Sequence, residues 1–106
     1  MNTFVHEIVV PSDHPSLAGH FPGQPVVPAV VLLDAVFAAM RARGVFVLQS
    51  ILAAKFLQAV LPDQSIELRL EFTAMAALQW RASFQGLRDG SLVFEGSFIV
   101  AAEPAS

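Results

Sequence analysis

The sequence predicts an α+β domain in which an antiparallel β-sheet wraps around one long central helix. Three observations support this fold class: one long apolar segment of helical character, several segments of strand character, and turn residues between them. The chain has 106 residues, which suits one compact domain and leaves no room for a second core. We therefore expect residues 1–106 to form a single domain.

The first three strand segments differ in how clearly their residues alternate. Thr3–Val10 is rich in β-branched and aromatic residues and stops at Pro11. Val45–Val60 is a long apolar segment whose pattern indicates extended chain. Ile66–Phe72 alternates strictly between apolar and polar residues, so it is the clearest strand of the sequence.

Two further strands are predicted near the C-terminus, with Asp89-Gly90 between them as a hairpin turn. One face of the first carries Trp80, Ala82 and Phe84. One face of the second carries Leu92, Phe94, Phe98 and Val100.

The helix is predicted between Pro28 and Arg43, because a proline suits the first helical turn and Gly44 follows the basic end. Between these ends the only acid is Asp34. The segment is apolar all round, which indicates a buried helix. A sheet of this size cannot cover every side of the helix alone, so we expect a second subunit to cover the rest.

Composition excludes several function classes. Hydrophobic residues make up 55% of the chain and charged residues 14%, and the net charge is −3. Nucleic acid is not expected as a ligand, because its binding needs a concentrated basic face. The absence of cysteine excludes disulfides and thiol catalysis. The histidines do not stand at metal-ligand spacing, so no metal site is expected.

No membrane span is expected either. The most apolar window, Val26–Met40, is broken by Pro28 and Asp34 and is shorter than the roughly 20 residues that a membrane helix needs. The N-terminal residues show no secretion signal. We therefore expect a cytoplasmic protein.

Two ionisable residues stand in apolar surroundings: His20 in a Gly-His-Phe-Pro-Gly loop, and Asp34 in the helix. Histidine can act as a base near neutral pH. Burial favours the protonated form of a carboxyl group, so Asp34 is expected to act as an acid. Elimination of water from a 3-hydroxyacyl chain requires such a pair, with the base at C2 and the acid at the C3 hydroxyl.

The start of the helix adds a third element. The N–H groups of Ala29 and the residues after it have no acceptor inside the helix, and they lie at the positive end of its dipole. Such a site can polarise a thioester carbonyl and stabilise an enolate oxygen. From the residues alone, however, Asp34 could equally be a structural partner of a polar group, and His20 an ordinary turn residue.

A longer pattern resembles a known family. The segment from His14 to Asp34, with its Gly-His-Phe-Pro-Gly loop, a proline at the helix start and an acid 14 residues after His20, resembles the signature of the 3-hydroxyacyl-acyl-carrier-protein dehydratases. Lys55–Pro62 is similar to the strand and turn that follow the helix in these hot-dog proteins. The short chain resembles the compact members of polyketide-like and aryl-polyene pathways.

The resemblance implies a hot-dog fold and the conversion of a (3R)-3-hydroxyacyl thioester on an acyl carrier protein to the trans-2-enoyl thioester. His20 of one subunit would face Asp34 of the other in a dimer or higher oligomer, which could include a second dehydratase-like subunit. Ala29 and Gly23 would bind the thioester, and Phe21 and Phe37 would line the acyl tunnel. No cofactor is implied, because the phosphopantetheine arm comes with the carrier protein.

Three positions depart from the family pattern. The acid is Asp34, where one branch of the family has Glu. Ala29 replaces a glycine, and Ala38 replaces a Gln one helical turn after the acid. The basic residues that could contact an acidic carrier protein are Arg41, Arg43, Lys55, Arg81 and Arg88.

Two other functions remain open at this point. One is a hot-dog acyl thioesterase, against which the Gly-His-Phe-Pro-Gly loop counts. The other is a non-catalytic acyl-binding subunit of a dehydratase complex, a role that Ala29 and Ala38 leave open.

Overall fold

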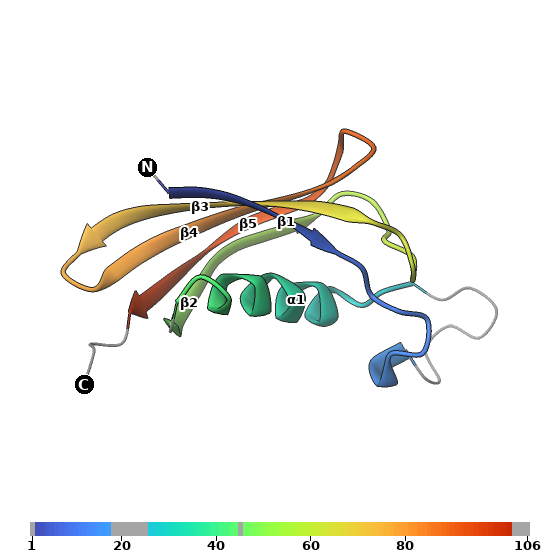
Figure 1. Cartoon of the computed structure of the whole chain (residues 1–106), viewed down its shortest axis with the longest axis horizontal. Helices are drawn as coiled ribbons and strands as arrows, with labels where there is room; N and C mark the ends of the chain where they lie inside the picture. The colour runs from blue at the N-terminus through green and yellow to red at the C-terminus, as the bar shows by residue number, and fades with distance from the viewer. Residues whose placement is uncertain (1, 18–25, 45, 103–106) are drawn as a thin grey trace.

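The computed structural model of the protein describes residues 2–17, 26–44 and 46–102. Within these ranges one helix packs against one face of a five-stranded antiparallel sheet (Figure 1). The strand order is β1-β3-β4-β5-β2. In chain order the elements are β1 (Asn2–Ile8), a short 3₁₀ helix η1 (Pro15–Leu17), α1 (Ala29–Arg41), β2 (Phe46–Phe56), β3 (Ile66–Ala76), β4 (Gln79–Arg88) and β5 (Ser91–Ala102).

The fold class expected from the sequence is confirmed, and the differences concern where elements end. β3 extends four residues beyond Phe72, to Ala76. It pairs with β4 along nearly its whole length, which stabilises residues that show no strict alternation of their own. In the described residues no helix is both long enough and apolar enough to cross a bilayer.

The predicted turn between β4 and β5 is also confirmed. Asp89 and Gly90 have φ angles of 51° and 81°. Two consecutive residues with positive φ are the mark of the tight turn whose twist matches that of the flanking strands, and aspartate followed by glycine tolerates this conformation well.

The core lies between α1 and the inner face of the sheet, the face toward the helix. Leu32, Val36 and Met40 stand one helical turn apart and are at most 3% exposed. The same core contains four buried phenylalanines of β3, β4 and β5, and the ring centroids of two of them, Phe84 and Phe98, are 5.0 Å apart. The strict alternation of β3 places Leu68 and Leu70 in the same core, fully buried.

The expectation that α1 is buried all round is wrong for the single chain. On the side away from the sheet, Val30 is 69% exposed, and Asp34 and Ala38 are also exposed. These residues are spaced four apart and form one stripe along the helix. Only one face of α1 contacts the sheet, so the described part of the chain leaves this stripe without cover.

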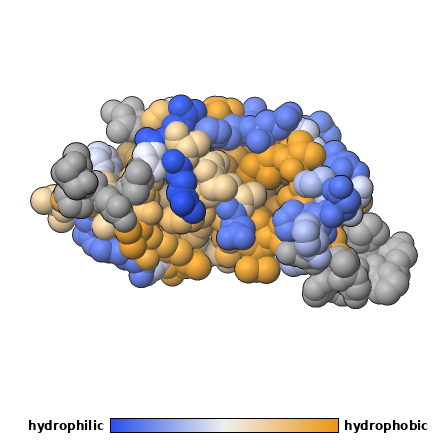
Figure 2. Space-filling model, turned by 60° about the horizontal axis from the view of Figure 1, so that its bottom comes forward, coloured by the Kyte–Doolittle hydropathy of each residue, from blue (hydrophilic) through white to orange (hydrophobic). Residues whose placement is uncertain are grey.

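β2 is similarly uncovered. It is an edge strand paired only with β5, and every one of its residues after Phe46 is exposed. Lys55 is its only charged residue and it contains no proline. Soluble proteins usually protect long edge strands with charges, prolines or a covering element, so this edge is suited to pairing with another strand. Figure 2 shows extensive apolar surface on the helix side of the molecule.

The packing of the core leads to a prediction at Gly86 of β4. A Cβ at this position would lie 2.7 Å from Cε1 of Phe94 and closer still to two other atoms of that buried ring. We expect Gly86→Ala to lower the free energy of unfolding by about 1–3 kcal/mol, as overpacking does. Denaturant unfolding of the purified protein measures this change.

A double-mutant cycle identifies the cause. Phe94→Leu removes the ring that the new methyl group meets, so Gly86→Ala should cost less in that background than in the parent chain. Strictly additive losses would show that the ring is not responsible.

Candidate active site

The start of α1 offers backbone donors to a ligand. Pro28 is the N-cap residue, with φ −62° and ψ 150°, and its carbonyl oxygen accepts bonds from the N–H groups of Val31 and Leu32 at 3.0 and 3.2 Å. The N–H groups of Ala29 and Val30 precede the first donors of the helix ladder. No described side chain caps this end. Within the described residues neither N–H has an acceptor, so both are available to a ligand oxygen. The thioester-binding role of Ala29 stays a prediction.

A cavity of about 220 Å³ adjoins this helix end. It has two walls. The first is formed by the start of α1 and the residues before it, and the second by the end of β2 and the residues after it. They are lined by Val26, Val27, Ala29, Leu32, Phe56, Leu57, Gln58, Ala59 and Val60. Its lining combines apolar side chains with polar backbone and Gln58 atoms, beside an Ala29 N–H without an acceptor among the described residues, which suits a group with a carbonyl oxygen and an aliphatic arm.

Backbone hydrogen bonds hold the two walls together. The N–H of Val27 donates to the carbonyl of Val60 at 2.8 Å. The N–H groups of Leu57 and Gln58 both donate to the carbonyl of Val93 on β5, at 2.8 and 3.2 Å. The cavity is thus fixed to the sheet on one side and to the helix approach on the other.

Arg88 fixes the second wall from β4. Its Nη1 donates to the carbonyl of Ala59 at 2.8 Å and to Oε1 of Gln64 at 2.9 Å, and its Nη2 donates to Oε1 of Gln58 at 2.8 Å. The sequence suggested Arg88 only as a contact for a carrier protein. Its contribution to the wall was missed because nothing in the local sequence links it to residues 58–64.

Asp34 lies on the exposed stripe of α1, five residues after Ala29 and thus about 7.5 Å further along the helix axis. The expectation that it is buried is wrong for the single chain, because the sheet covers only the opposite face of the helix. The neighbouring position in the stripe is Ala38, whose methyl group cannot hydrogen-bond the carboxylate. The side of Asp34 away from the sheet is open to a second molecule.

The remaining residues of the predicted site are placed only in part. His20, Phe21 and Gly23 lie outside the described residues. Phe37 is half-buried, and its ring meets that of Phe98 edge to face, with centroids 6.4 Å apart. One edge of Phe37 therefore belongs to the core, and a tunnel could be lined only by its remaining surface.

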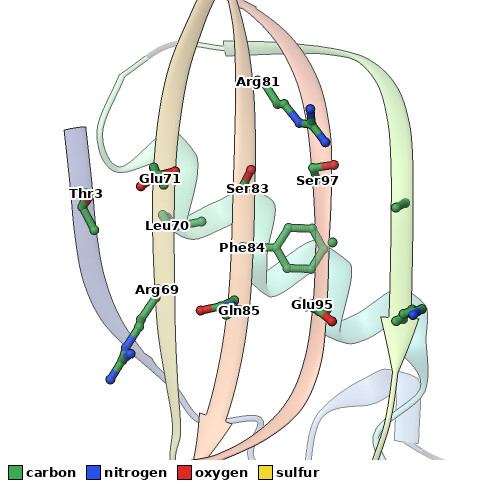
Figure 3. A pocket seen from close by; sticks show the side chains of 13 residues that line it. Thr3, Arg69, Leu70, Glu71, Arg81, Ser83, Phe84, Gln85, Glu95 and Ser97 are labelled. Carbon is green, nitrogen blue, oxygen red and sulfur yellow. The ribbon is translucent and has the colours of Figure 1, made fainter. Parts of the chain in front are cut away.

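A larger cavity, of about 630 Å³, lies on the outer face of the sheet, away from α1 (Figure 3). Short side chains at Ser83, Ser97 and Ala53 are paired across three strands and form its floor. Its rim carries cations and carboxylates together, including Arg81 and Glu95. It contains none of the residues predicted to react, so its size does not make it the candidate site.

The ApeI-like dehydratase family matches residues 1–96, a range that includes both His20 and Asp34. The chain belongs to this family. It is also 32% identical, over 103 residues, to the 3-hydroxyacyl-[acyl-carrier-protein] dehydratase FabZ of Anaeromyxobacter sp. (strain Fw109-5). That match covers 85% of this chain and 65% of the relative, so the chain spans slightly less than two thirds of the relative's length.

Solved structures confirm the hot-dog fold of this ApeI-like chain. The dehydratase heterocomplex ApeI:P from Xenorhabdus doucetiae superposes with a TM-score of 0.74 at 17% identity, over 93% of this chain and 87% of the other. The fluoroacetyl-CoA thioesterase FlK superposes with a TM-score of 0.71 at 15% identity, over 96% and 85%. At these identities the likeness concerns the fold, which dehydratases and thioesterases share.

Proposed function

We propose that the chain removes water from a (3R)-3-hydroxyacyl thioester carried by an acyl carrier protein and releases the trans-2-enoyl thioester. The observation that carries this proposal is the family match across residues 1–96, together with a cavity at the helix start that Ala29 lines, where the Ala29 N–H has no acceptor among the described residues. The FabZ relative is named as a 3-hydroxyacyl-[acyl-carrier-protein] dehydratase, which supports the proposal. A cytoplasmic location, with such a carrier protein as partner, forms part of the proposal.

In the proposed reaction His20 takes the proton from C2 of the acyl chain. The electron pair left on C2 is delocalised onto the thioester oxygen, which the N–H of Ala29 stabilises, with Gly23 beside the thioester. Asp34 donates a proton to the C3 hydroxyl, which leaves as water while the C2–C3 double bond forms. The proton count balances: one proton leaves C2 and one reaches the departing oxygen, with no cofactor required.

The active site is proposed to form between two copies of the chain. Asp34 lies on a helix stripe without cover, and the exposed edge β2 runs alongside on the same protomer. Pairing of β2 with β2 of a second copy would continue the sheet and bring a second molecule over the open face of α1. His20 of one subunit could then approach Asp34 of the other, with Phe21 and Phe37 along the acyl chain.

The proposed reaction first predicts what happens when the acid–base pair is changed. With a 3-hydroxyacyl thioester on a carrier protein as substrate, absorbance of the enoyl product should appear with the parent protein and vanish with His20→Ala. Asp34→Asn should lower kcat by about 10²–10⁴-fold, the usual contribution of a positioned acid or base.

Asp89→Asn is the matched control, because asparagine also tolerates the positive φ of that turn. It should leave turnover unchanged. Full activity in both site variants would overturn the assignment. A free thiol released from the substrate without enoyl product would indicate a thioesterase instead.

The second prediction isolates the N–H of Ala29. Ala29→Pro deletes this donor at a position where proline is tolerated, since the preceding residue has the extended ψ of 150° that proline requires. We expect kcat to fall about 10²–10³-fold, as when an oxyanion donor is removed, with little change in thermal stability.

Ala29→Gly is the control, because it keeps the N–H and should keep the activity. If Ala29→Pro turned over like Ala29→Gly, the thioester oxygen would have to be held elsewhere.

The third prediction concerns the edge strand. Ile51 and Leu52 are successive residues of β2, 51% and 50% exposed, at an irregularity in its pairing with β5. We expect the parent to elute as a multiple of 11.4 kDa, and Ile51→Glu or Leu52→Glu to shift it toward the single chain with loss of turnover. Light scattering on the eluted peak and circular dichroism report mass and fold.

Val5→Glu serves as the control, since Val5 is 57% exposed on β1, at the opposite edge of the sheet. A β2 variant that is both a single chain and fully active would show that the site does not need a second copy.

A further inference from the structure

The sheet is longer than the helix that covers it, and this leaves part of its inner face without helical cover. β3 has 11 residues and α1 has 13. These counts correspond to about 36 Å of strand and about 20 Å of helix. Figure 1 shows the end of the sheet that carries the β3–β4 turn extending past the C-terminal end of α1.

An apolar cavity of about 230 Å³ lies at this uncovered end. Each of the five strands contributes one residue, and the chain after α1 contributes one cation. The lining residues are Phe4, Phe46, Phe72, Trp80, Ala102 and Arg43. Phe46 stacks on Phe72 with centroids 5.3 Å apart, and Phe4 meets Phe72 edge to face at 5.9 Å.

Arg43 is exposed, and two contacts orient its guanidinium at this cavity. Its guanidinium carbon lies 4.2 Å from the centroid of Phe4, a cation–π contact. Its Nε donates a hydrogen bond of 3.0 Å to Nε2 of His6 on β1. Within the described residues its two terminal nitrogens, Nη1 and Nη2, have no hydrogen-bond partner and no carboxylate within ion-pair distance.

We propose that this cavity is a second binding site, for a small carboxylate with an apolar tail. The two terminal nitrogens of a guanidinium match the two oxygens of a carboxylate, and the aromatic walls suit the tail. A single negative charge suits the occupant, because Arg43 is the only charged residue among the described residues of the lining. It is smaller than a drug-sized ligand, whose pockets are usually above about 300 Å³.

The site is separate from the proposed thioester site. It lies at the opposite end of α1 from Ala29, and the two cavities share no lining residue. The proposal therefore does not depend on the dehydratase reaction, and either one can fail without the other.

The chain contains its own reporter, because Trp80 is its only tryptophan. Titration of the full-length protein with hexanoate at pH 7 should give a saturable change in Trp80 fluorescence, and calorimetry should give the same Kd. Hexanol, which has the same tail without the charge, and acetate, which has the charge without the tail, should each bind at least about tenfold more weakly.

Arg43→Gln should weaken hexanoate binding about tenfold or more, the effect of losing a charge-assisted hydrogen bond. Arg41→Gln is the matched control, since Arg41 is an exposed arginine of the same helix end that does not line the cavity. Its Kd should stay within about twofold of the parent, because an exposed charge outside the site contributes little.

Equal binding of hexanol and hexanoate, or an unchanged Kd in Arg43→Gln, would overturn the proposal. Binding that appears only after removal of residues 103–106 would also overturn it, because the site would then be closed in the full chain.

Discussion

The packing of one helix stripe against one face of the sheet determines most of this structure. On the helix side this contact is made by Leu32, Val36 and Met40 of α1. On the sheet side it is made by the buried phenylalanines of the central strands. Since a helix presents its residues all round, a single sheet leaves the far stripe uncovered. Asp34 lies in that stripe, so the contact that stabilises the chain also presents the proposed acid to a second molecule.

Much of the fold could be predicted from local patterns. The strict alternation of Ile66–Phe72 fixed both a strand and its buried face, and Asp89-Gly90 fixed a turn, because backbone and solvent preferences agree at these positions. The burial of α1 could not be predicted in the same way. An all-apolar helix indicates burial, but the sequence does not tell whether its own sheet or a second copy supplies the cover.

In the candidate site, too, local sequence patterns point to some residues, and long-range contacts that the sequence does not reveal position others. Ala29 and Asp34 could be singled out as candidates, because N–H groups without helix acceptors follow from the helix geometry itself and an acid among apolar residues stands out. Arg88 and the wall it supports could not be predicted. Its bonds to Gln58, Ala59 and Gln64 connect residues 24 to 30 positions apart, and such contacts depend on the register of the strands rather than on neighbouring residues.

The hydrogen bonds that Arg88 donates to residues 58–64 bear on the proposed recognition of the substrate. Two of the residues that Arg88 holds, Gln58 and Ala59, line the cavity at the helix start. This surface is therefore ordered without a ligand, so in the proposed reaction little chain entropy would be lost when the arm of the substrate enters. In that reaction Arg88 would act only through Gln58 and Ala59, as a positioning residue without contact to the reacting carbons.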